Sequence, residues 1–591
     1  MKETRKYTRK ETFTGFYTDI FNAFENETAY IFKPAGHTAR SKYIKKSFKD
    51  FNRDRIVLKN FLIENGYSKK KIALLGRNSY VWATSIGAIL SSDNIAVPLD
   101  KDLQINELKQ SLERSEVSAL IYDKKYEEVV LEACKDLKDL NLYTFDSVQK
   151  LFNDSNDEVK ELMENESEES NEKDELKLLL FTSGTTSMSK MVMLTRDNLL
   201  TNMYDTSDKE KLYITDSNIA LLPFHHVFGL VGSLIMLQNG VRTAFPDGLR
   251  YVAQNLEEYE ISVFIGVPLL VEGIYNKVVE SAKKNKKWGL LKAMIKISNF
   301  LRKFGIDLRR KLFKSVIDGL GGHMRFIISA AASLDPEVLY FFNDIGILTI
   351  QGYGLTETSP VLTAETDTKQ MPGSVGIVME HTEIKIDKKA LLDFYIDSLG
   401  FSEDDPALKE VINGEEGEIL ARGRNITKGY YKDPVRTKEA FTEDGWFRTG
   451  DVGYMKGEFL FITGRIKDMI VLPNGKKAFP EEMEFLFHEL DGVIETFVFG
   501  SDKNLGFGAG GETKIYISIY YDEEYFKGKS EEDIHKYFSD EVKKINRTLP
   551  KYKYIRGVIL SNREFIKTST KKIKRNIEKD NVEKEHALWT K

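Results

Sequence analysis

A short hydroxyl-rich stretch between Leu178 and Lys190 is the strongest candidate for chemistry in this chain. It reads LLLFTSGTTSMSK, so an apolar run typical of a buried strand leads into small residues and ends in a lysine. In such a loop, backbone N–H groups and hydroxyls can approach anionic oxygens closely, and Lys190 adds positive charge. It is not a Walker A motif, because Ser189 and Met191 replace the second glycine and the magnesium-binding hydroxyl. We interpret it as a phosphate cradle, with a Ser/Thr-rich surface turn as the alternative; the candidate contacts are Thr182, Ser183, Gly184, Thr185, Thr186 and Lys190.

Six further motifs follow the loop in a fixed order. They are LPFHHVFG (222–229), SAAASLDPEV (329–338), QGYGLTET (351–358), GWFRTGDVGYM (445–455), FITGRIKDMI (461–470) and KTSTKKIKR (567–575). Together with the loop they resemble the adenylate-forming, AMP-binding superfamily, and specifically its acyl-CoA synthetases. The resemblance runs from about Ile72 to Arg575, which is most of the chain.

The resemblance implies a nucleotide site. Tyr353 would offer an aromatic face to adenine, Thr356 a hydroxyl to the α-phosphate, and Glu357 a hard oxygen ligand to Mg²⁺. Asp451 would accept hydrogen bonds from both ribose hydroxyls, and Arg465 would contact ribose and phosphate. The backbone of Ala331 and Ala332 would lie along adenine and the acyl carbonyl. Gly352 and Gly354 of the QGYGLTET motif would also contact the nucleotide, and Thr185 would be a second Mg²⁺ ligand.

The resemblance also implies catalytic residues. Lys572 would stabilise the charge that develops when a carboxylate attacks the α-phosphate. Family members usually have Gly-Lys there, whereas this chain has Lys571 before Lys572, so a register shifted by one residue stays open. His226 corresponds to the family histidine at the acyl and pantetheine junction, with a core histidine as the alternative. Lys467 corresponds to a hinge about which the C-terminal domain would alternate between two poses.

The chain departs from the family pattern at two places. Alanines stand at positions 330 and 331, where family members often have two glycines, so we expect a slightly bulkier pocket wall. Ser187 and Ser189 stand where glycine and proline are common, which puts nucleotide affinity in doubt rather than reaction type.

We expect ATP-dependent activation of a long-chain fatty acid to acyl-AMP, followed by transfer to CoA, with ATP, Mg²⁺ and CoA required. The long-chain branch is favoured by the segment Ser262 to Val279 and the basic stretch after it. The alternative enzyme is a fatty acyl-AMP ligase that passes the acyl group to an acyl carrier protein. A binding protein that has lost activity is a third hypothesis, which pyrophosphate exchange would exclude.

The elements that must position these residues read as an α/β protein. From Lys71 an apolar strand, a helical stretch and a second apolar run ending at Pro98 form a βαβ pattern, which predicts mostly parallel sheets flanked by helices. After Val411, short strands and glycine turns indicate a small β-rich subdomain. We predict an N-terminal adenylation domain over 1–464 and a mobile α+β C-terminal domain over 465–591.

Two charged segments interrupt this pattern. Residues 153–177 are acidic and nearly free of aromatic side chains, which predicts a solvated, partly disordered insertion or an acidic docking surface. Residues 280–320 interleave lysine and arginine with apolar side chains in a basic amphipathic pattern. For the latter, surface helices packed on the core and peripheral contact with an anionic membrane or carrier protein, through 280–314, both stay open.

Composition limits the remaining classes. The 591 residues are 41% hydrophobic and 30% charged, enough for more than one core, and the net charge of −5 argues against a general nucleic-acid binder. The single cysteine, Cys134, excludes an internal disulfide framework and fits a reducing cytoplasm. No apolar run approaches the ~18 residues that span a bilayer. We therefore expect a cytoplasmic protein, with peripheral contact at the inner face of the membrane as an option.

Overall fold

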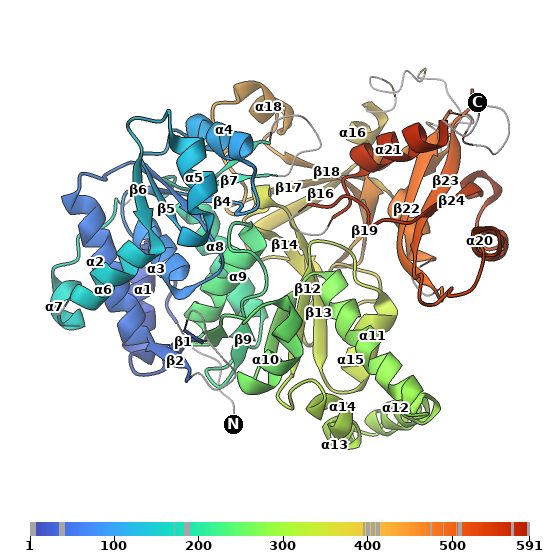
Figure 1. Ribbon diagram of the computed structural model, residues 1–591, viewed down its shortest axis with the longest axis horizontal. Helices are drawn as coiled ribbons and strands as arrows, with labels where there is room; N and C mark the ends of the chain where they lie inside the picture. The colour runs from blue at the N-terminus through green and yellow to red at the C-terminus, as the bar shows by residue number, and fades with distance from the viewer. Residues whose placement is uncertain are drawn as a thin grey trace. The chain divides into compact units, whose positions relative to one another are not determined.

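The structure is a computed structural model that describes residues 7–34, 42–155, 157–170, 172–182, 189–393, 396, 402, 408, 414–472, 476–487, 490–503, 505, 511–568 and 572–587. The chain divides into two compact units. Unit 1 comprises Met1–Gly184, Met188–Glu383 and Arg422–Gly445, and the described part of unit 2 comprises Ile384–Ala421 and Trp446–Lys591. Each is described by itself below (Figure 1).

The first sheet of unit 1 has the strand order β6-β5-β3-β4-β7-β8. Neighbours are parallel except β7 and β8, which pair antiparallel. The strands are β3 (Lys71–Leu75), β4 (Ile95–Leu99), β5 (Ala119–Tyr122), β6 (Asn141–Thr144), β7 (Leu176–Phe181) and β8 (Met191–Thr195).

The second sheet of unit 1 has the order β15-β14-β13-β12-β11-β9-β10-β1-β2. Its middle, from β13 to β1, is parallel, and β2, β14 and β15 join antiparallel at the two ends. The strands are β1 (Thr28–Phe32), β2 (Ile44–Ser47), β9 (Ser217–Ile219), β10 (Arg242–Ala244), β11 (Val263–Gly266), β12 (Phe326–Ala330), β13 (Leu348–Gly354), β14 (Val361–Ala364) and β15 (Ile377–Val378).

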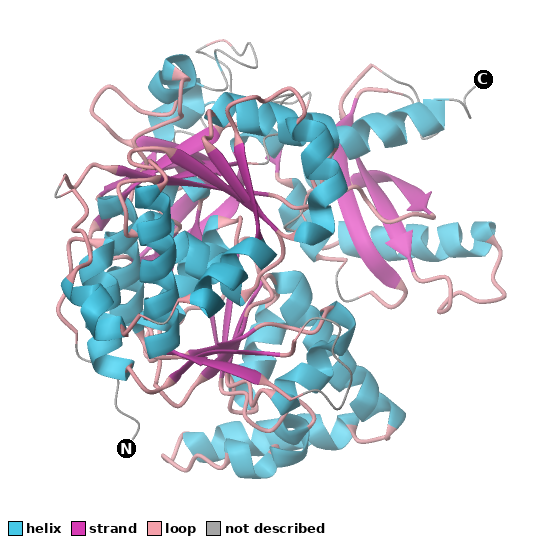
Figure 2. Ribbon diagram, turned by 60° about the vertical axis from the view of Figure 1, so that its left-hand side comes forward, coloured by secondary structure: helices cyan, strands magenta, loops and turns pink. Residues whose placement is uncertain are grey.

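Helices cover both faces of these sheets (Figure 2). In β3, Ile72 and Leu74 belong to one buried apolar cluster, and Ala73 and Leu75 to another on the opposite face. Since successive strand side chains alternate, a strand that is apolar at every position must be buried on both sides. The predicted mostly parallel α/β architecture is therefore confirmed.

The helices that surround the two sheets of unit 1 fall into three groups along the chain. The N-terminal ones are α1 (Phe13–Phe24), α2 (Phe48–Glu64), α3 (Tyr80–Leu90), α4 (Ile105–Ser115), α5 (Glu127–Cys134), α6 (Phe145–Asp154) and α7 (Val159–Glu164). The middle ones are α8 (Arg196–Lys209), α9 (Val227–Gln238) and α10 (Val252–Glu258). The last are α11 (Pro268–Lys284), α12 (Trp288–Arg302), α13 (Arg309–Leu312), α14 (Lys314–Asp318), α15 (Pro336–Asp344) and α18 (Pro434–Glu439).

Unit 2 contains a β-rich part and an α+β part. The first holds β16 (Thr382–Asp387), β17 (Gly417–Gly423), β18 (Phe447–Lys456) and β19 (Phe459–Arg465) in that order, with α16 (Lys388–Asp393). The second holds the β20 (Ile470–Val471) and β21 (Lys477–Ala478) pair and a sheet of β22 (Val493–Ser501), β23 (Lys514–Tyr521) and β24 (Ile555–Ser561). Its helices are α19 (Pro480–Phe485), α20 (Glu531–Asn546) and α21 (Arg575–Ala587).

The predicted boundary at 464/465 falls inside unit 2. An apolar cluster that joins Leu391 and Val452 to Phe479 runs across this position, so contacts group the β-rich strands with the C-terminal residues. The two predicted domains and the hinge at Lys467 stay predictions about motion.

The acidic segment 153–177 is exposed at about half of its positions, as its composition predicts, but some of its carboxylates are buried in the protein. It contains α7, and Glu166 is buried between two cations of α2: its Oε1 lies 2.6 Å from Nη1 of Arg55 and 2.9 Å from Nζ of Lys59. The ammonium of Lys177, on β7, lies 3.3 Å from Glu169, and both side chains are buried. These carboxylates are internal counter-ions, which local composition does not reveal.

The basic segment 280–320 has two different faces. Leu291, Phe313 and Ile317 are buried in the apolar core beside α15, as expected for surface helices that pack on the protein. The opposite side of α12 presents Leu290, Ile297 and Phe300, which are 61%, 58% and 59% exposed. In the part of the chain that the structure describes, no helix is both long and apolar enough to cross a bilayer.

We predict that Glu166→Gln lowers the free energy of unfolding by about 3–5 kcal/mol, because it leaves two buried cations without their carboxylate. Urea unfolding followed by circular dichroism measures this. Glu168→Gln is the matched control, since Glu168 is exposed in the same segment. Equal effects of the two substitutions would contradict the buried-ion interpretation.

Candidate functional site

The strands β7 and β8 bracket the predicted phosphate loop. Phe181 is paired with Met191, and the N–H of Thr182 donates to the carbonyl of Lys190 at 2.9 Å. This ladder fixes where the loop leaves and re-enters the sheet. Of the predicted loop contacts, Thr182 and Lys190 are described, whereas Ser183, Gly184, Thr185 and Thr186 lie outside the described residues.

The side chain of Tyr430 bridges Lys190 and Glu357, and this tyrosine was not among the predicted site residues. The Lys190 ammonium lies 3.4 Å from the hydroxyl of Tyr430 and 4.4 Å from its ring centre. The same hydroxyl donates to Oε1 of Glu357 at 3.0 Å. A cation and a carboxylate from distant parts of unit 1 thus share one aromatic side chain.

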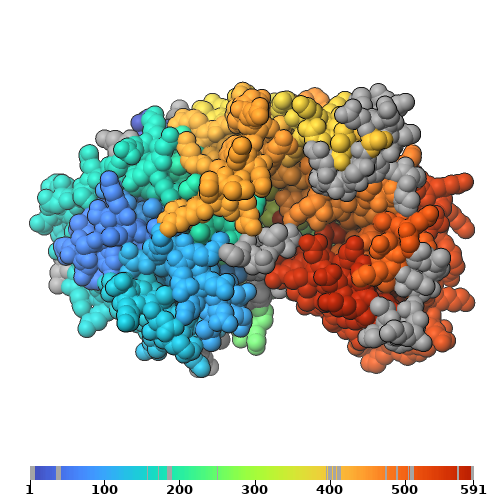
Figure 3. Space-filling model, turned by 90° about the horizontal axis from the view of Figure 1, so that it is seen from above, coloured from blue at the N-terminus to red at the C-terminus, as the bar shows by residue number. Residues whose placement is uncertain are grey.

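Backbone hydrogen bonds bring Tyr430 to this position. The segment from Thr427 to Tyr431 runs along β8: the N–H of Met193 donates to Gly429 at 3.0 Å, and the N–H of Tyr431 donates to Met191 at 2.8 Å. The N–H of Thr427 also donates to the carbonyl of Glu357 at 2.8 Å. In Figure 3, the light-orange surface of the region around residue 430 lies against blue N-terminal residues of the same unit.

The environment of Tyr430 keeps its hydroxyl protonated. The residue is 4% exposed, and its pKa is raised, first by burial and then by the negative charge of Glu357 beside it. It is therefore a permanent hydrogen-bond donor that orients Glu357. The only signal in the sequence was a tyrosine pair after a glycine in KGYYKDP, which by itself predicts a turn.

Strand β13, in the second sheet of unit 1, carries the predicted adenine contact. Tyr353 is 9% exposed, and Thr356, Glu357 and Thr358 form a short 3-10 helix directly after the strand. Gly354 is required there, because a Cβ on it would lie 1.7 Å from the carbonyl oxygen of Pro360.

The neighbouring strand β12 leads into the predicted pocket wall. Ala331 follows it with a φ of +77°, a left-handed conformation that costs an L-residue roughly 1–2 kcal/mol. The alanine that replaces a family glycine thus stands where glycine would be unstrained. Ala332, the next residue, is exposed.

The predicted acyl-junction histidine begins helix α9. His226 is partly exposed, and its carbonyl accepts from the N–H of Leu230 at 2.9 Å in the first helical turn. His225 is the more buried of the two, at 8% exposure.

Within unit 2, the predicted ribose contacts form a pair. Asp451 on β18 and Arg465 on β19 are cross-strand partners, and Nε of Arg465 donates to Oδ1 of Asp451 at 2.6 Å. The carboxylate is nearly buried, whereas about a third of the Arg465 side chain (36%) stays exposed. Lys467 follows as an exposed residue of a short 3-10 turn.

Lys572 stands on a tight turn of unit 2. Its N–H donates to Oγ1 of Thr568 at 3.2 Å, and its carbonyl accepts from the N–H of Thr568 at 2.8 Å. Arg575, three residues on, is fixed by a two-point ion pair with Glu484. Lys571 lies outside the described residues.

The pKa of Lys572 is lowered. Desolvation is the largest cause, the positive charges of Arg465 and Lys467 add to it, and Asp451 opposes them. The residue nevertheless retains solvent exposure. Lys572, Arg465 and Asp451 therefore belong to one electrostatic cluster in unit 2.

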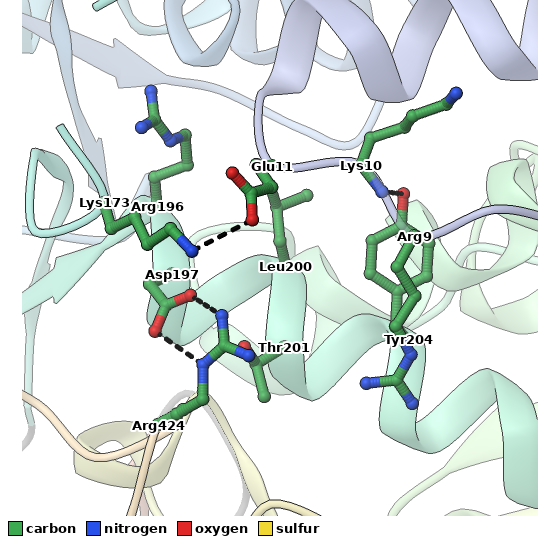
Figure 4. Close-up of a pocket in the computed structure, with 10 residues that line it drawn as sticks. All are labelled: Arg9, Lys10, Glu11, Lys173, Arg196, Asp197, Leu200, Thr201, Tyr204 and Arg424. Carbon is green, nitrogen blue, oxygen red and sulfur yellow. Dashed lines mark hydrogen bonds and ion pairs between the residues drawn. The ribbon is translucent and has the colours of Figure 1, made fainter. Parts of the chain in front are cut away.

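A separate charged pocket in unit 1 is not the predicted site. Ten residues line it, including the N-terminal Arg9, Lys10 and Glu11 (Figure 4). Four of its charged side chains pair with one another, since Lys173 lies 2.9 Å from Glu11 and Arg424 forms a two-point ion pair with Asp197. Contacts of Arg9 and Lys10 with Asp205 and Tyr204 join the N-terminal segment to α8.

Comparison with known proteins decides the family. The family model described as AMP-binding enzyme matches residues 20–431, most of the chain. The chain belongs to the AMP-binding enzyme family. The fold agrees: the chain is similar to ATP-bound MatB from Rhodopseudomonas palustris, with a TM-score of 0.70 at 20% identity over 97% of this chain and 99% of that one.

Two curated relatives of this AMP-binding enzyme are from Arabidopsis thaliana. Peroxisomal long chain acyl-CoA synthetase 6 is 30% identical over 342 residues, 56% of this chain and 47% of the relative. A chloroplastic long-chain-fatty-acid–[acyl-carrier-protein] ligase is 26% identical over 514 residues, 73% of this chain and 67% of the relative. The match to the first thus spans about half of that relative's length.

The residues of unit 1 fit a magnesium ion as far as they are described. Glu357 is partly exposed, and a carboxylate has acceptor sites beyond the one that Tyr430 uses. Hard oxygen ligands of this type suit Mg²⁺. Thr185, the second predicted ligand, lies outside the described residues.

We predict that Tyr430→Phe weakens binding of Mg-ATP at least about tenfold. The substitution removes a hydrogen bond to a charged group, and such bonds contribute about 1.5–3 kcal/mol. Calorimetric titration with Mg-ATP measures the change. Tyr431→Phe is the control, because that hydroxyl donates to the surface residue Glu116 instead; equal losses in both variants would refute the role of Tyr430.

Proposed function

We propose that this AMP-binding enzyme is a long-chain fatty acid:CoA ligase that forms acyl-AMP as its intermediate. The observation that carries the proposal is the Lys190–Tyr430–Glu357 cluster in a member of this family, because it places a cation and an oriented carboxylate together as a nucleoside triphosphate requires. The long-chain specificity rests on what the relatives are named for.

In the first half-reaction a fatty acid carboxylate oxygen attacks the α-phosphorus of ATP. The bond from that phosphorus to the bridging oxygen breaks, and pyrophosphate leaves with the bonding electrons. Lys190 neutralises phosphate charge, Tyr353 supports adenine, and Thr356 donates to the α-phosphate. Magnesium, when bound at Glu357, neutralises further phosphate charge.

In the second half-reaction the CoA sulfur attacks the acyl carbonyl carbon. The bond from that carbon to the AMP oxygen breaks, the thiol proton passes to solvent, and acyl-CoA and AMP result. In the first half-reaction, before acyl-AMP forms, His226 is proposed to orient the fatty acid carboxylate rather than to act as a base, because a carboxylic acid is already ionised near neutral pH.

The residues of unit 2 supply the remaining groups in this proposal. Asp451 and Arg465 hold the ribose, and Lys572 stabilises charge on the phosphoryl and carboxyl oxygens during adenylation. A rotation at Lys467 is proposed to follow adenylation, when Lys572 leaves the reacting atoms. It would bring the loop around Gly475 toward the CoA thiol; this loop lies outside the described residues.

The exposed apolar and basic side chains of α12 favour a peripheral contact with a membrane surface. Leu290, Ile297, Phe300 and Phe304 follow one another at spacings of seven, three and four residues, which places them on one side of α12 and the turn after it. Exposed lysines and arginines, such as Lys292, Lys296 and Lys303, accompany them. We propose that this basic apolar stripe contacts anionic lipid, in which a long-chain fatty acid also dissolves.

An acyl-carrier-protein ligase is the second candidate function. The relative named for that acceptor favours it, and the basic stripe would also suit an acidic carrier protein. Replacing CoA by carrier protein in the assay separates the two: thioester on CoA supports the first proposal, and thioester on carrier protein alone supports the second.

We predict that Lys572→Ala lowers fatty-acid-dependent ATP–pyrophosphate exchange by at least ~10²- to 10³-fold. Because the ammonium is the active form and its pKa is lowered, wild-type exchange falls as pH rises, earlier than an ordinary lysine would cause. Lys572→Arg, whose guanidinium stays protonated, moves this alkaline fall to higher pH.

Lys574→Arg, at an exposed neighbouring lysine, is the control and leaves the profile unchanged. An alkaline fall that is identical in the wild type and Lys572→Arg would remove Lys572 from this role. Absence of exchange with any fatty acid in a folded protein would overturn the proposed function.

We predict that the double variant Phe300→Ser, Phe304→Ser partitions onto phosphatidylglycerol vesicles more than tenfold less than the wild type. Burying one phenylalanine side chain contributes about 1.5–3 kcal/mol, and the double variant loses two. Vesicle co-sedimentation measures the partition. Tyr525→Ser is the control, because Tyr525 is 53% exposed in unit 2, away from the stripe in sequence.

A further inference from the structure

Two histidines and an aspartate converge in unit 1 beside the proposed acyl site. Asp100 directly follows the buried strand β4, and His225 and His226 directly precede α9. Nε2 of His225 lies 3.4 Å from Oδ2 of Asp100, and the two imidazole rings lie 4.3 Å apart between centres. One ligand atom from each of the three residues lies within 4.8 Å of the others.

The His225 side chain is buried, and its Nε2 ring nitrogen makes no hydrogen bond with a described residue. His225 is 8% exposed, and its Nε2 has no hydrogen-bond partner among the described residues, although it lies toward Asp100. A buried polar atom without a partner is costly and calls for an explanation. A ligand held between His225 and Asp100 would satisfy it.

The loop that carries the histidines is fixed in place. The side-chain amide of Asn78 donates to the carbonyls of Ala220 and Leu222 at 3.0 and 2.7 Å and accepts from the N–H of Phe224 at 3.0 Å. Gly229 lets the first turn of α9 pack closely, because a Cβ there would lie 2.4 Å from the carbonyl oxygen of Pro223. The backbone that carries both histidines is therefore held in place.

We propose that Asp100, His225 and His226 form a site for a transition-metal ion of the Zn²⁺ class. Imidazole nitrogens and one carboxylate suit Zn²⁺, whereas Mg²⁺ prefers oxygen ligands. Ligand atoms of a tetrahedral zinc site stand about 3.3 Å apart, given metal–ligand distances near ~2.0 Å. The Asp100 and His225 atoms already have this spacing, and the His226 ligand atom lies within 4.8 Å of both; water would be the fourth ligand.

A second cluster of the same residue types provides the contrast. Asp205, Glu380 and His381 also bring their ligand atoms together in unit 1. There, however, Nη1 of Arg9 lies 2.8 Å from Asp205 and 3.3 Å from Nδ1 of His381, so a guanidinium already neutralises the carboxylate. At the first cluster, by contrast, Nε2 of His225 is a buried ring nitrogen without a hydrogen-bond partner among the described residues, which favours that cluster as the metal site.

Metal binding at this site has a consequence that rests on the proposed function. A ring nitrogen of His226 that coordinates zinc can no longer orient the acyl carboxylate. Zn²⁺ would therefore inhibit thioester formation.

Zinc binding to the full chain, measured by competition with a chromophoric chelator, tests the site itself. The expected result is one Zn²⁺ per chain in the wild type, with affinity at least about tenfold lower in His225→Ala and Asp100→Asn. His381→Ala keeps the wild-type affinity. Equal affinity in the wild type and His225→Ala, or a loss of binding in His381→Ala, overturns the proposal.

Two further measurements keep the test independent of folding and of activity. X-ray absorption of the zinc-loaded wild type is expected to give two imidazole ligands, and none or one overturns the proposal. In the thioester assay, Zn²⁺ is expected to inhibit the wild type at concentrations that leave Asp100→Asn active. Absence of thioester without zinc in both proteins rejects the proposed function alone, since chelator competition still decides the site.

Discussion

The hydroxyl of Tyr430 holds together three stretches of unit 1 that lie far apart in the chain. It is 240 residues from Lys190 and 73 from Glu357, yet it contacts both side chains at hydrogen-bonding distance. Because the hydroxyl is buried and its pKa is raised, it donates at every physiological pH. The orientation of Glu357, and with it the proposed metal and phosphate chemistry, depends on this one donor.

The position of Lys190 depends on the strands β7 and β8 that flank the predicted loop. Buried charge pairs help to hold β7 in place. Lys177 of β7 is enclosed with Glu169 and Glu175, and its ammonium donates to the carbonyl of Ser92 at 2.6 Å. Removing one partner of such a buried ion pair would leave an uncompensated charge, at a cost of about 3–5 kcal/mol. These contacts anchor the start of β7, the strand that leads into the predicted phosphate loop.

The sequence predicts local features well and distant partnerships poorly. The apolar run before Thr182 predicts β7, and the motifs name Glu357, Asp451 and Arg465 as candidate site residues, but the pairing of Asp451 with Arg465 across neighbouring strands is seen only in the structure. By contrast, the acidic segment reads as solvated because Arg55 and Lys59, which bury Glu166, come more than 100 residues earlier (separations of 111 and 107). Tyr430 is missed for the same reason, since a tyrosine in a turn carries no periodic signal.

Departures from the family pattern are best judged by backbone geometry. Gly354 could not be replaced, because the carbonyl of Pro360 occupies the space of a Cβ. Ala331 is tolerated, since its strain is conformational and of order 1–2 kcal/mol, small enough for the surrounding strands to offset. A substitution that adds strain leaves the strand order and the position of Tyr353 unchanged, whereas one that adds a clash would displace β13 itself. In this chain a side chain is therefore excluded at Gly354 by a clash, whereas at Ala331 it costs only conformational strain.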